Sequence, residues 1–471
     1  MNLVLWLLFS LLAISISGVN IQLAFALALG LGAILGWKTH CDFAQRNAQS
    51  PERLSHARRS AHGIKRAVAN LGWLLDALAT LLLIVSSRTV VIGFALVAMS
   101  FVLRWWTCGA PFARTALNLP IALLTAMIAV GVLVSADVLT SLRMFGVLLA
   151  GINAFYAITA RVHTERALHW LVGGLIAGAS ALALVAPWSV EWPQNKLFAL
   201  GRVYRMFTLM LSDSIHANVL AGLLAPAICV VVAIFLFHPF DDVPDDQRRL
   251  TRVLLAFALV LMATMLFLTQ SRGALAIVFL GVLILIATRQ RWIGAFVALG
   301  AVIALIVIAS LLGFSSLLDL ILTSDKISGL SGREEIWSRG FFALQDFPFT
   351  GVGLGLFPRV VEVFYPLFML GAGEEMPHAH NLYLQVGIDT GIPGLVAFVA
   401  LIVGAILLAW RNTRVARASR NRALFALNLG ALIALSVIAG HGLVDAVVWL
   451  SKPAFFMWAW LGVVAASAEI L

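Results

Sequence analysis

Long apolar runs separated by short basic loops limit how this chain can fold more than any other feature. Of its 471 residues, 62% are hydrophobic and only 11% are charged, whereas about 25% are charged in a typical soluble domain. Several runs approach the roughly 20 residues that a helix needs to cross a bilayer. The sequence therefore predicts an all-α polytopic integral membrane protein.

Fourteen apolar segments are candidate spans, and because the first two are short, the predicted count is twelve to fourteen transmembrane helices. The segments lie at about 3–18, 20–37, 70–86, 89–103, 117–135, 139–160, 167–187, 216–238, 253–269, 273–288, 293–313, 391–410, 424–440 and 446–468. We expect a membrane domain over residues 1–313, a large outward loop with short helices over 314–390, and C-terminal membrane helices over 391–471.

The N-terminal segment has no basic region and no small-x-small cleavage site, so it is predicted to be the first span rather than a removable signal. The three cysteines, Cys41, Cys108 and Cys229, lie far apart without metal-type spacing. Neither a structural zinc site nor a disulfide framework is expected from them.

The distribution of Lys and Arg selects one orientation of the predicted spans. With the N-terminus in the cytoplasm, six loops on that side carry 21 of the 32 Lys and Arg residues, and the short loops opposite carry only Arg88, Arg272 and Lys452. Excess cations in cytoplasmic loops fix the topology of such proteins, so the net charge of +10 requires no nucleic-acid partner. The two long loops, 188–215 and 314–390, are predicted to face outward.

Each long outward loop contains a predicted helix. NKLFALGRVYRMFTLML in loop 188–215 places Arg202 and Arg205 three residues apart, as in a helix that lies in the membrane interface. SGREEIWSRGFFALQDF in loop 314–390 predicts a second helix. In the following FPFTGVGLGLFP, the glycine spacing and the lack of a βαβ unit favour tight backbone packing over a nucleotide-binding loop.

Charged side chains at the edges of predicted spans are functional candidates, because burying them unpaired is expensive. Arg272 in TQSRGALA lies at the outward face between two spans; the alternative is an arginine that only reaches to the interface. Arg143 lies about one turn into another span, where it either pairs with Asp76 or Asp137 or has a functional role. Arg161 is predicted to anchor the topology.

The acidic stretch DDVPDD (241–246) resembles a magnesium-binding aspartate motif. Pro244 breaks the helix that such a motif requires, and the predicted topology places the stretch in the cytoplasm. A solvated acidic turn is therefore the favoured interpretation.

The polar stretch EEMPHAHNLYLQVGIDTGIPG precedes a long hydrophobic run. A helix is predicted to begin near His380 and to end at Gly391, which places His380 and Asn381 at an outward-facing helix N-terminus, where unpaired amides favour an anion. His378 cannot share a helical face with His380, so at most one of the two is expected to reach the same reacting atom. The alternative is a helix cap with no chemistry.

Four stretches resemble the O-antigen ligases, within the wider O-antigen ligase and polymerase superfamily. They are HN followed after nine residues by GIPG, SRGALA beside one span, GREEIW…GVGLGLF in the long loop, and HANVLAGLLAP at the start of another span. The resemblance covers roughly residues 200–400, and the N-terminal third matches only as a set of membrane spans.

The resemblance implies a polytopic glycosyltransferase of the C fold type in the bacterial inner membrane, with its active site on the periplasmic side. Such enzymes need no metal ion or other cofactor. They move a glycan, with inversion, from an undecaprenyl diphosphate carrier to an acceptor sugar on lipid A–core. The implied partners are thus the lipid-linked donor, the lipid A–core acceptor and the bilayer.

Arginine chemistry suits such a transfer. The leaving lipid diphosphate gains negative charge as the glycosidic bond breaks, and guanidinium groups bind phosphate oxygens without losing their own charge. We expect Arg272 and Arg333 to stabilise that charge in place of a metal, with Arg143, Arg202 and Arg205 as candidate helpers.

His380 is the predicted general base on the acceptor hydroxyl, because an imidazole titrates near neutrality; the alternative is a hydrogen bond to the diphosphate. Asn381 is expected to orient substrate or to cap the helix, and His378 is a further candidate for substrate binding.

Three other functions compete with ligation. An O-antigen polymerase and a protein oligosaccharyltransferase belong to the same superfamily. A transporter of anions or of polysaccharide lipid would typically show repeated halves with interrupted helices, and no such repeat is apparent in the sequence.

Overall fold

The computed structural model describes most of the chain from Gly63 onward. The described residues are 6, 10, 22, 25, 28, 29, 31, 32, 34–38, 63–85, 89–193, 200–207, 214–238, 244–312, 330–368, 376–451 and 454–471. Most of the predicted first span, part of the second, Cys41 and residues 314–329 of the long loop therefore lie outside the described residues.

The described part of the chain is helical apart from its connections and one pair of two-residue strands. Its elements are α4 (Gly63–Val85), α5 (Val90–Cys108), α6 (Asn118–Leu133), α7 (Val138–Thr159), α8 (Glu165–Ser189), β1 (Val190–Glu191), α9 (Gly201–Tyr204), β2 (Ile215–His216), α10 (Ala217–Phe237), α11 (Asp245–Leu268), α12 (Arg272–Arg289), α13 (Arg291–Leu312), α15 (Leu330–Asp346), α16 (Phe357–Phe364), α17 (Leu382–Ala418), α18 (Arg422–His441) and α19 (Phe455–Ile470).

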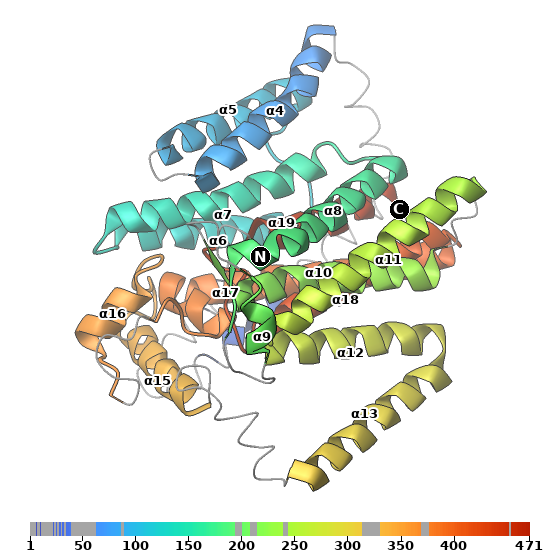
Figure 1. The fold of residues 1–471 in the computed structure, drawn as a ribbon. Coiled ribbons are helices and arrows are strands. Elements are labelled where there is room, and N and C mark those ends of the chain that lie inside the picture. The colour runs from blue at the N-terminus through green and yellow to red at the C-terminus, as the bar shows by residue number, and fades with distance from the viewer. Residues whose placement is uncertain are drawn as a thin grey trace.

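Seven described helices are long and apolar enough to cross a membrane: α7, α8, α10, α11, α12, α17 and α18. Shorter apolar stretches lie in α4, α5, α6, α13 and α19. Each of these helices overlaps one of the predicted segments. In Figure 1, α7, α8, α10, α11, α12 and α18 run across the picture, and α15 and α16 lie at the left-hand end. The prediction of an all-α polytopic membrane protein is confirmed.

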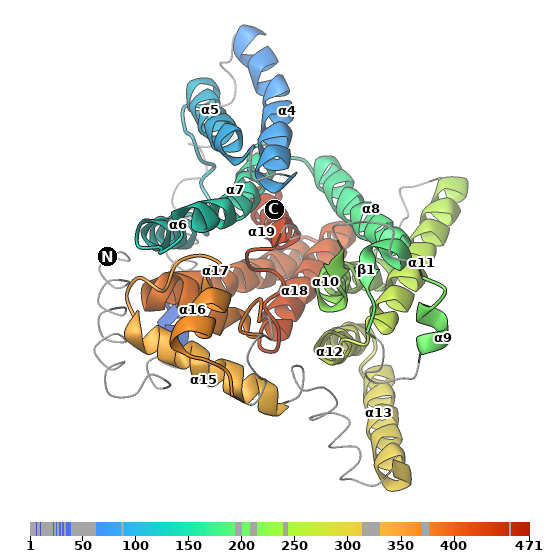
Figure 2. The same cartoon turned by 60° about the vertical axis from the view of Figure 1, so that its left-hand side comes forward.

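Three of the apolar helices form the centre of the molecule. In the most apolar 18-residue stretches of α10, α17 and α18, 72–83% of the residues are buried, whereas in those of α11 and α12 only 22% are buried. Figure 2 shows α10, α17, α18 and α19 surrounded by the other helices. A helix that is apolar all round is stable either in a protein core or in lipid, so the exposed apolar faces of α11 and α12 suit contact with lipid.

Gly391 divides α17 into two helical segments, as predicted for the GIPG stretch. Its φ of 72° lies outside the helical region, and a Cβ here would lie 2.3 Å from the carbonyl oxygen of Phe349. The facing loop also approaches α17 closely at a glycine: a Cβ at Gly351 would lie 2.5 Å from the carbonyl oxygen of Ile388. The Val352 amide donates to that carbonyl at 2.8 Å. The expected tight backbone packing of FPFTGVGLGLFP is confirmed.

A loop of residues 442–451 separates α18 from α19, although a span is predicted over 446–468. Helix α19 begins only at Phe455. The loop is held against α17 because the indole N–H of Trp449 donates to the buried carboxylate of Asp389 at 2.7 Å. The prediction was wrong here because an apolar run also forms when a loop is buried among helices.

Buried charges join the α4–α5 hairpin to its neighbours. The carboxylate of Asp76, only 3% exposed, pairs with Arg104 and, at 2.6 Å, with Arg161. Arg161 thus balances a buried charge, beyond its predicted role as a topology anchor. Arg143 is exposed on α7 and, among the described residues, forms neither of the ion pairs expected with Asp76 and Asp137.

Strands β1 and β2 pair in parallel through Val190 and Ile215 and hold the two ends of the first long loop together. The predicted interface helix of this loop is helical only over α9; residues 194–199 and 208–213 lie outside the described residues. The hydroxyl of Tyr204 donates to the carbonyl of Leu268 at 2.7 Å. Helix α9 therefore lies against the corner between α11 and α12.

The acidic stretch 241–246 is described from Pro244 onward. Asp245 and Asp246 are exposed in the first turn of α11, so they form the start of a helix rather than a turn. The other end of α11, at Leu268, lies close to Arg272 along the chain. Because a helix of this length spans about 36 Å, the acidic residues lie at the opposite end of the bundle from Arg272.

Candidate active site

The two predicted histidines lie in the short loop that precedes α17. Asn381 is the N-cap of this helix, and its side-chain oxygen accepts a hydrogen bond from the Leu384 amide at 2.9 Å. The predicted capping role of Asn381 is therefore present in the structure. His380 has a φ of +47°, which is uncommon for a residue other than glycine and marks many functional sites.

Both polar groups of the Ala379 backbone are fixed by buried side chains. Its amide donates to Gln385 at 2.7 Å, and its carbonyl accepts from the indole of Trp337 in α15 at 2.9 Å. The side-chain amide of Gln385 in turn donates to Asp389 at 3.1 Å. The histidine loop is thus held between the outer helix α15 and the central helix α17.

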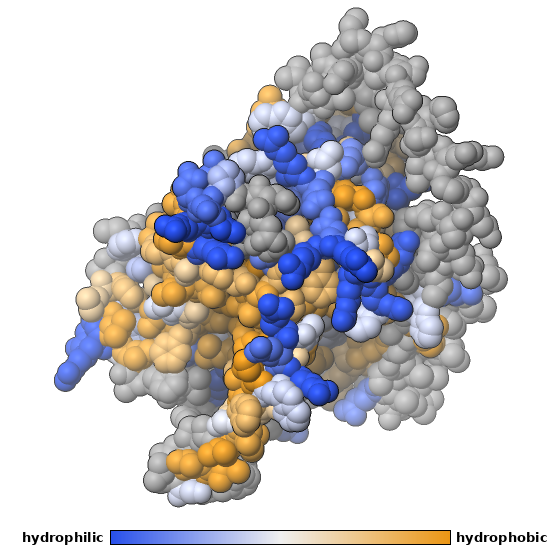
Figure 3. Space-filling model, turned by 90° about the vertical axis from the view of Figure 1, so that its right-hand side faces the viewer, coloured by the Kyte–Doolittle hydropathy of each residue, from blue (hydrophilic) through white to orange (hydrophobic). Residues whose placement is uncertain are grey.

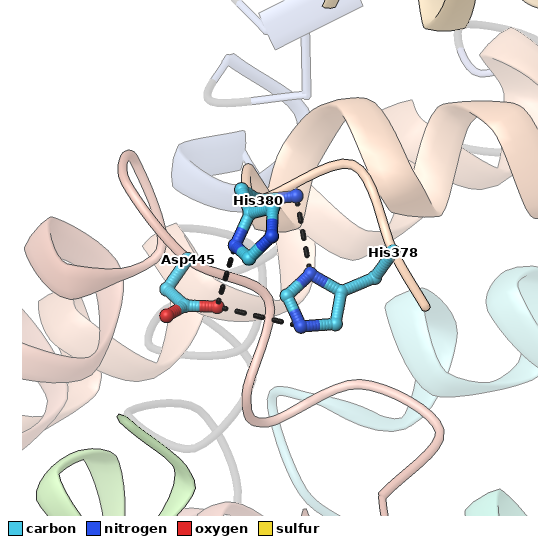
Figure 4. A group of neighbouring side chains, drawn as sticks. All are labelled: His378, His380 and Asp445. Atoms are coloured by element: carbon cyan, nitrogen blue, oxygen red, sulfur yellow. Dashed lines mark hydrogen bonds and ion pairs between the residues drawn. The ribbon is translucent and has the colours of Figure 1, made fainter. Parts of the chain in front are cut away.

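Asp445, in the loop before α19, lies against both histidines. Its Oδ1 is 3.7 Å from Nε2 of His378 and 3.7 Å from Nδ1 of His380. The two imidazole rings have centroids 4.3 Å apart, and Nδ1 of His378 accepts a hydrogen bond from the backbone N–H of His380. Figure 4 shows the three side chains converging from the two loops.

This arrangement corrects the expectation that at most one histidine can reach a common atom. The expectation holds only if His378 and His380 both belong to the helix. Helix α17 begins only at Leu382, and the left-handed backbone of His380 turns the chain so that both rings face Asp445.

The Asp445 carboxylate is almost completely buried but well provided with donors. Its second oxygen accepts from the side chain of Asn218, in the first turn of α10, at 2.8 Å, and the first accepts from the Ala446 amide. Burial alone would raise the pKa of Asp445, but its interactions with the neighbouring His380, His378 and His441 hold that pKa well below its usual range. The group is therefore a carboxylate at neutral pH.

The two imidazoles differ in their surroundings. Burial lowers the pKa of His378 to about 4, the charge of His380 adds to this shift, and Asp445 opposes it. His378 is therefore neutral at physiological pH. Nδ1 of His380 faces Asp445 slightly beyond hydrogen-bonding distance, which leaves Nε2 on the other edge of the ring. An aspartate behind one ring nitrogen is the arrangement by which enzymes orient a histidine base.

Arg272 and Arg333 lie beside this group. Arg272 is the first residue of α12, and Arg333 lies in the first turn of α15. Burial lowers the pKa of Arg333, Asp445 opposes the shift, and the charge of Arg272 adds to it. Arg333 thus lies within electrostatic reach of both, and guanidinium groups remain charged in proteins. Two arginines and one carboxylate leave an excess of positive charge that favours an anion.

A glycine permits the close approach of the Asp445 loop to α12. A Cβ at Gly273, the residue after Arg272, would lie 2.5 Å from the side chain of Val444. The preceding turn is also unusual, since the buried Gln270 has a φ of +51°. Its side-chain amide donates to the Tyr204 hydroxyl at 2.7 Å, which fixes the turn that presents Arg272.

The histidines and Asp445 also have a spacing that suits a metal ion. One ligand atom from each of His378, His380 and Asp445 lies within 4.8 Å of the others. Two imidazoles and a carboxylate bind several divalent metals. The neighbouring guanidinium groups of Arg272 and Arg333 would repel a dication, as like charges do.

The remaining predicted arginines are not joined to this cluster by any contact among the described residues. Arg202 and Arg205 are exposed on α9, and Arg205 donates to the backbone carbonyl of Gly201 within its own turn. Arg143 is exposed on α7. The structure brings together Arg272, Arg333, His378, His380 and Asn381.

A comparison with protein families adds an independent observation. The family model described as O-antigen ligase (Wzy_C) matches residues 257–399, less than a third of the chain. This segment of the chain is therefore similar to the O-antigen ligase family. No curated protein matches the chain. The matched O-antigen ligase segment contains Arg272, Arg333, His378, His380 and Asn381, and it ends before Asp445.

Asp445 and Asn218 belong to this cluster but were missed from the sequence. Asp445 is a lone carboxylate between two predicted spans. Arg272 was selected because it is a charge at the edge of a span, and Asp445 meets the same criterion. Asn218 lies within HANVLAGLLAP, a stretch already noted for its resemblance, but an asparagine among apolar residues gives no signal of the carboxylate that it contacts.

Proposed function

We propose that the protein ligates O-antigen glycan from an undecaprenyl diphosphate carrier to the lipid A–core oligosaccharide, with inversion and without a metal ion. The observation that carries the proposal is the convergence of two arginines, two histidines and a buried aspartate from separate segments at one end of a membrane-helix bundle. The match of residues 257–399 to the O-antigen ligase family supports the reaction class, a glycosyl transfer.

The arginines are proposed to hold the leaving diphosphate. As the glycosidic bond breaks, its electron pair remains with the diphosphate oxygen, whose negative charge grows. Arg272 and Arg333 are partly buried, and prearranged charges in a site of low dielectric constant stabilise developing charge strongly. Asp445, which lies against both histidines and attracts Arg333, is proposed to hold these groups together before substrate binds.

His380 is proposed to remove the proton of the acceptor hydroxyl, whose oxygen then attacks the anomeric carbon from the face opposite the diphosphate. Asp445 stabilises the resulting imidazolium, and its 3.7 Å separation from Nδ1 is of the kind that shortens when substrate binds. His378 is proposed to bind substrate, since its low pKa makes it a poor base. Direct hydrogen bonding of His380 to the diphosphate is the alternative role.

The protein is proposed to reside in the bacterial inner membrane with this site facing the periplasm. The charge distribution of the sequence supports the placement, because the cations of the predicted cytoplasmic loops lie at the opposite end of the bundle. Loop 314–390, which provides Arg333 and both histidines, is then the large periplasmic loop.

The test uses purified protein with lipid-linked glycan and rough lipopolysaccharide. We expect a ladder of extended lipopolysaccharide from the wild type, and a loss of about 10²-fold or more in rate from His380→Ala and Arg272→Ala, with normal membrane insertion. Arg143→Ala, which alters an exposed arginine away from the cluster, is the matched control and should retain activity.

The same assay separates the competing functions. Longer lipid-linked glycan without extended lipopolysaccharide would identify a polymerase, and glycan on an added serine-containing acceptor protein would identify an oligosaccharyltransferase. Transport without any glycan transfer would overturn the proposal, as would a His380→Ala variant that remains nearly fully active.

A further inference from the structure

A second concentration of positive charge lies at the end of the bundle away from His380. An open pocket of about 480 Å³ is found where α10, α12 and α17 end and α18 begins. Its cationic lining consists of Arg252, Arg289, Arg417, Arg420 and Arg422. Figure 3 faces this end of the molecule and shows hydrophilic side chains gathered over a more apolar body.

These five arginines come from three connections that lie far apart in the sequence. Arg252 belongs to the first half of α11, Arg289 ends α12, and the other three lie at the junction of α17 and α18. The orientation of a membrane protein requires cations in such loops, but it does not require them to line one pocket. Among the described residues, the lining includes no Asp or Glu.

One part of the pocket wall is apolar. Phe235, Leu236, Phe237 and Phe425 line it together with the arginines, and two of these aromatic rings, Phe237 and Phe425, pack edge to face. A cationic mouth at the ends of membrane helices combined with an apolar wall matches a molecule with a phosphate group and hydrocarbon chains. A freely soluble anion would gain nothing from the apolar wall.

We propose that this pocket binds the phosphate head group of an anionic lipid of the cytoplasmic leaflet. Guanidinium groups bind phosphate oxygens in pairs of parallel hydrogen bonds, and basic pockets between membrane helices on the cytoplasmic side bind such head groups. Five arginines suffice for two phosphates, so a lipid with two phosphates, such as cardiolipin, binds more tightly than one with a single phosphate. The bound lipid neutralises the repulsion among the arginines and stabilises the α17–α18 junction.

The experiment measures lipid binding to the purified, delipidated full-length protein. We expect cardiolipin to bind and to raise the melting temperature, and phosphatidylcholine to do neither. The triple variant Arg417→Gln, Arg420→Gln, Arg422→Gln is expected to bind cardiolipin roughly tenfold more weakly or worse. Arg166→Gln removes an exposed arginine of α8, which begins at the same end of the bundle, but Arg166 does not line the pocket; this control should bind cardiolipin as the wild type does.

Three results would overturn the proposal. The first is that the triple variant binds cardiolipin as tightly as the wild type does, or that the Arg166→Gln control loses as much affinity for cardiolipin as the triple variant loses. Another is equal binding of phosphatidylcholine by the wild type. The third is that inorganic pyrophosphate displaces cardiolipin at matched concentration. This result would assign the pocket to a soluble anion. The last two results come from the wild type alone and do not depend on the folding of a variant.

Discussion

At the scale of single residues, the candidate site converges on Asp445. Its carboxylate lies 3.7 Å from a nitrogen of each of two histidines, accepts a hydrogen bond from Asn218 and acts electrostatically on Arg333. A buried charge with this many partners is costly to leave unbalanced. Asp445 is thus a positioning residue whose removal should affect the histidines and the arginine together.

Asp445→Asn is expected to lower the rate of glycan transfer on the order of 10²-fold, because the histidine base loses the group that orients it and stabilises its protonated form. The acidic limb of the pH–rate profile should move to lower pH, since the protonated histidine base loses its counter-charge. A purely structural role would lower the amount of folded protein without moving that limb. The rate and profile are measured on purified protein.

Asp137→Asn provides the matched control for this substitution. Asp137 caps α7 through the Thr140 amide, and asparagine is an equally good N-cap. This variant should retain the wild-type rate and pH profile. Nearly full activity of Asp445→Asn would show that the carboxylate does not support the reaction.

Chelation tests whether His378, His380 and Asp445 act with arginines or with a metal. If Arg272 and Arg333 stabilise the leaving diphosphate, exhaustive treatment with EDTA should leave the transfer rate unchanged. Added Zn²⁺ should inhibit, because the spacing of the three ligands admits an ion that would occupy the histidine base. Activity lost on chelation and restored by one divalent metal would contradict the metal-independent mechanism.

At the scale of elements, the break in α17 determines where the histidine loop lies. The short helical segment before Gly391 carries Asn381 and the loop outward from the bundle, while the segment after it lies in the core. The loop that contains Gly351 packs into this break. The backbone conformation of Gly391 therefore links the fold of the long loop to the position of the site.

Gly391→Ala is expected to destabilise the protein by about 2 kcal/mol or more, because a left-handed backbone disfavours a side chain and the new Cβ would meet the carbonyl oxygen of Phe349. The melting temperature of the purified protein and its transfer rate should both fall. Gly173→Ala places a Cβ in open space on α8, so it should leave the melting temperature unchanged or slightly higher. Equal behaviour of the two variants would refute the proposed constraint.

At the scale of the whole molecule, the bundle separates two clusters of charged side chains. The cluster around Asp445 lies at one end, and the arginine-lined pocket lies at the other. This separation agrees with the orientation predicted from the loops, in which most cations remain in the cytoplasm. In this proposed orientation the two ends face different solutions and are expected to bind different anions, a substrate diphosphate and a structural lipid.

This orientation predicts the accessibility of single cysteines in a background without native cysteines. Arg359→Cys, on α16, should react with a membrane-impermeant maleimide in cells whose outer membrane alone is permeable. Arg166→Cys, on α8, should react only after the inner membrane is opened. Both arginines are exposed, so burial does not limit labelling. The reverse pattern, or labelling of both from one side, would contradict the topology.

The sequence alone determined the fold class and the approximate ends of most helices, and it predicts an outward position for His380 and Arg272. These are local properties, because the length of an apolar run and the charge beside it act on each segment separately. The break at Gly391 was likewise readable, since the conformational freedom of glycine belongs to the residue itself.

Only the tertiary structure decided which polar groups meet. Asn218 contacts Asp445 across 227 positions of the chain, and His378 joins His380 only because the backbone turns before α17 begins. Among the described residues, the same packing gives Arg143, Arg202 and Arg205 no contact with the cluster, although their local patterns were as suggestive as that of Arg272. Contacts of this kind depend on how helices pack and where glycines let loops approach, and the pattern within one segment carries no record of its distant neighbours.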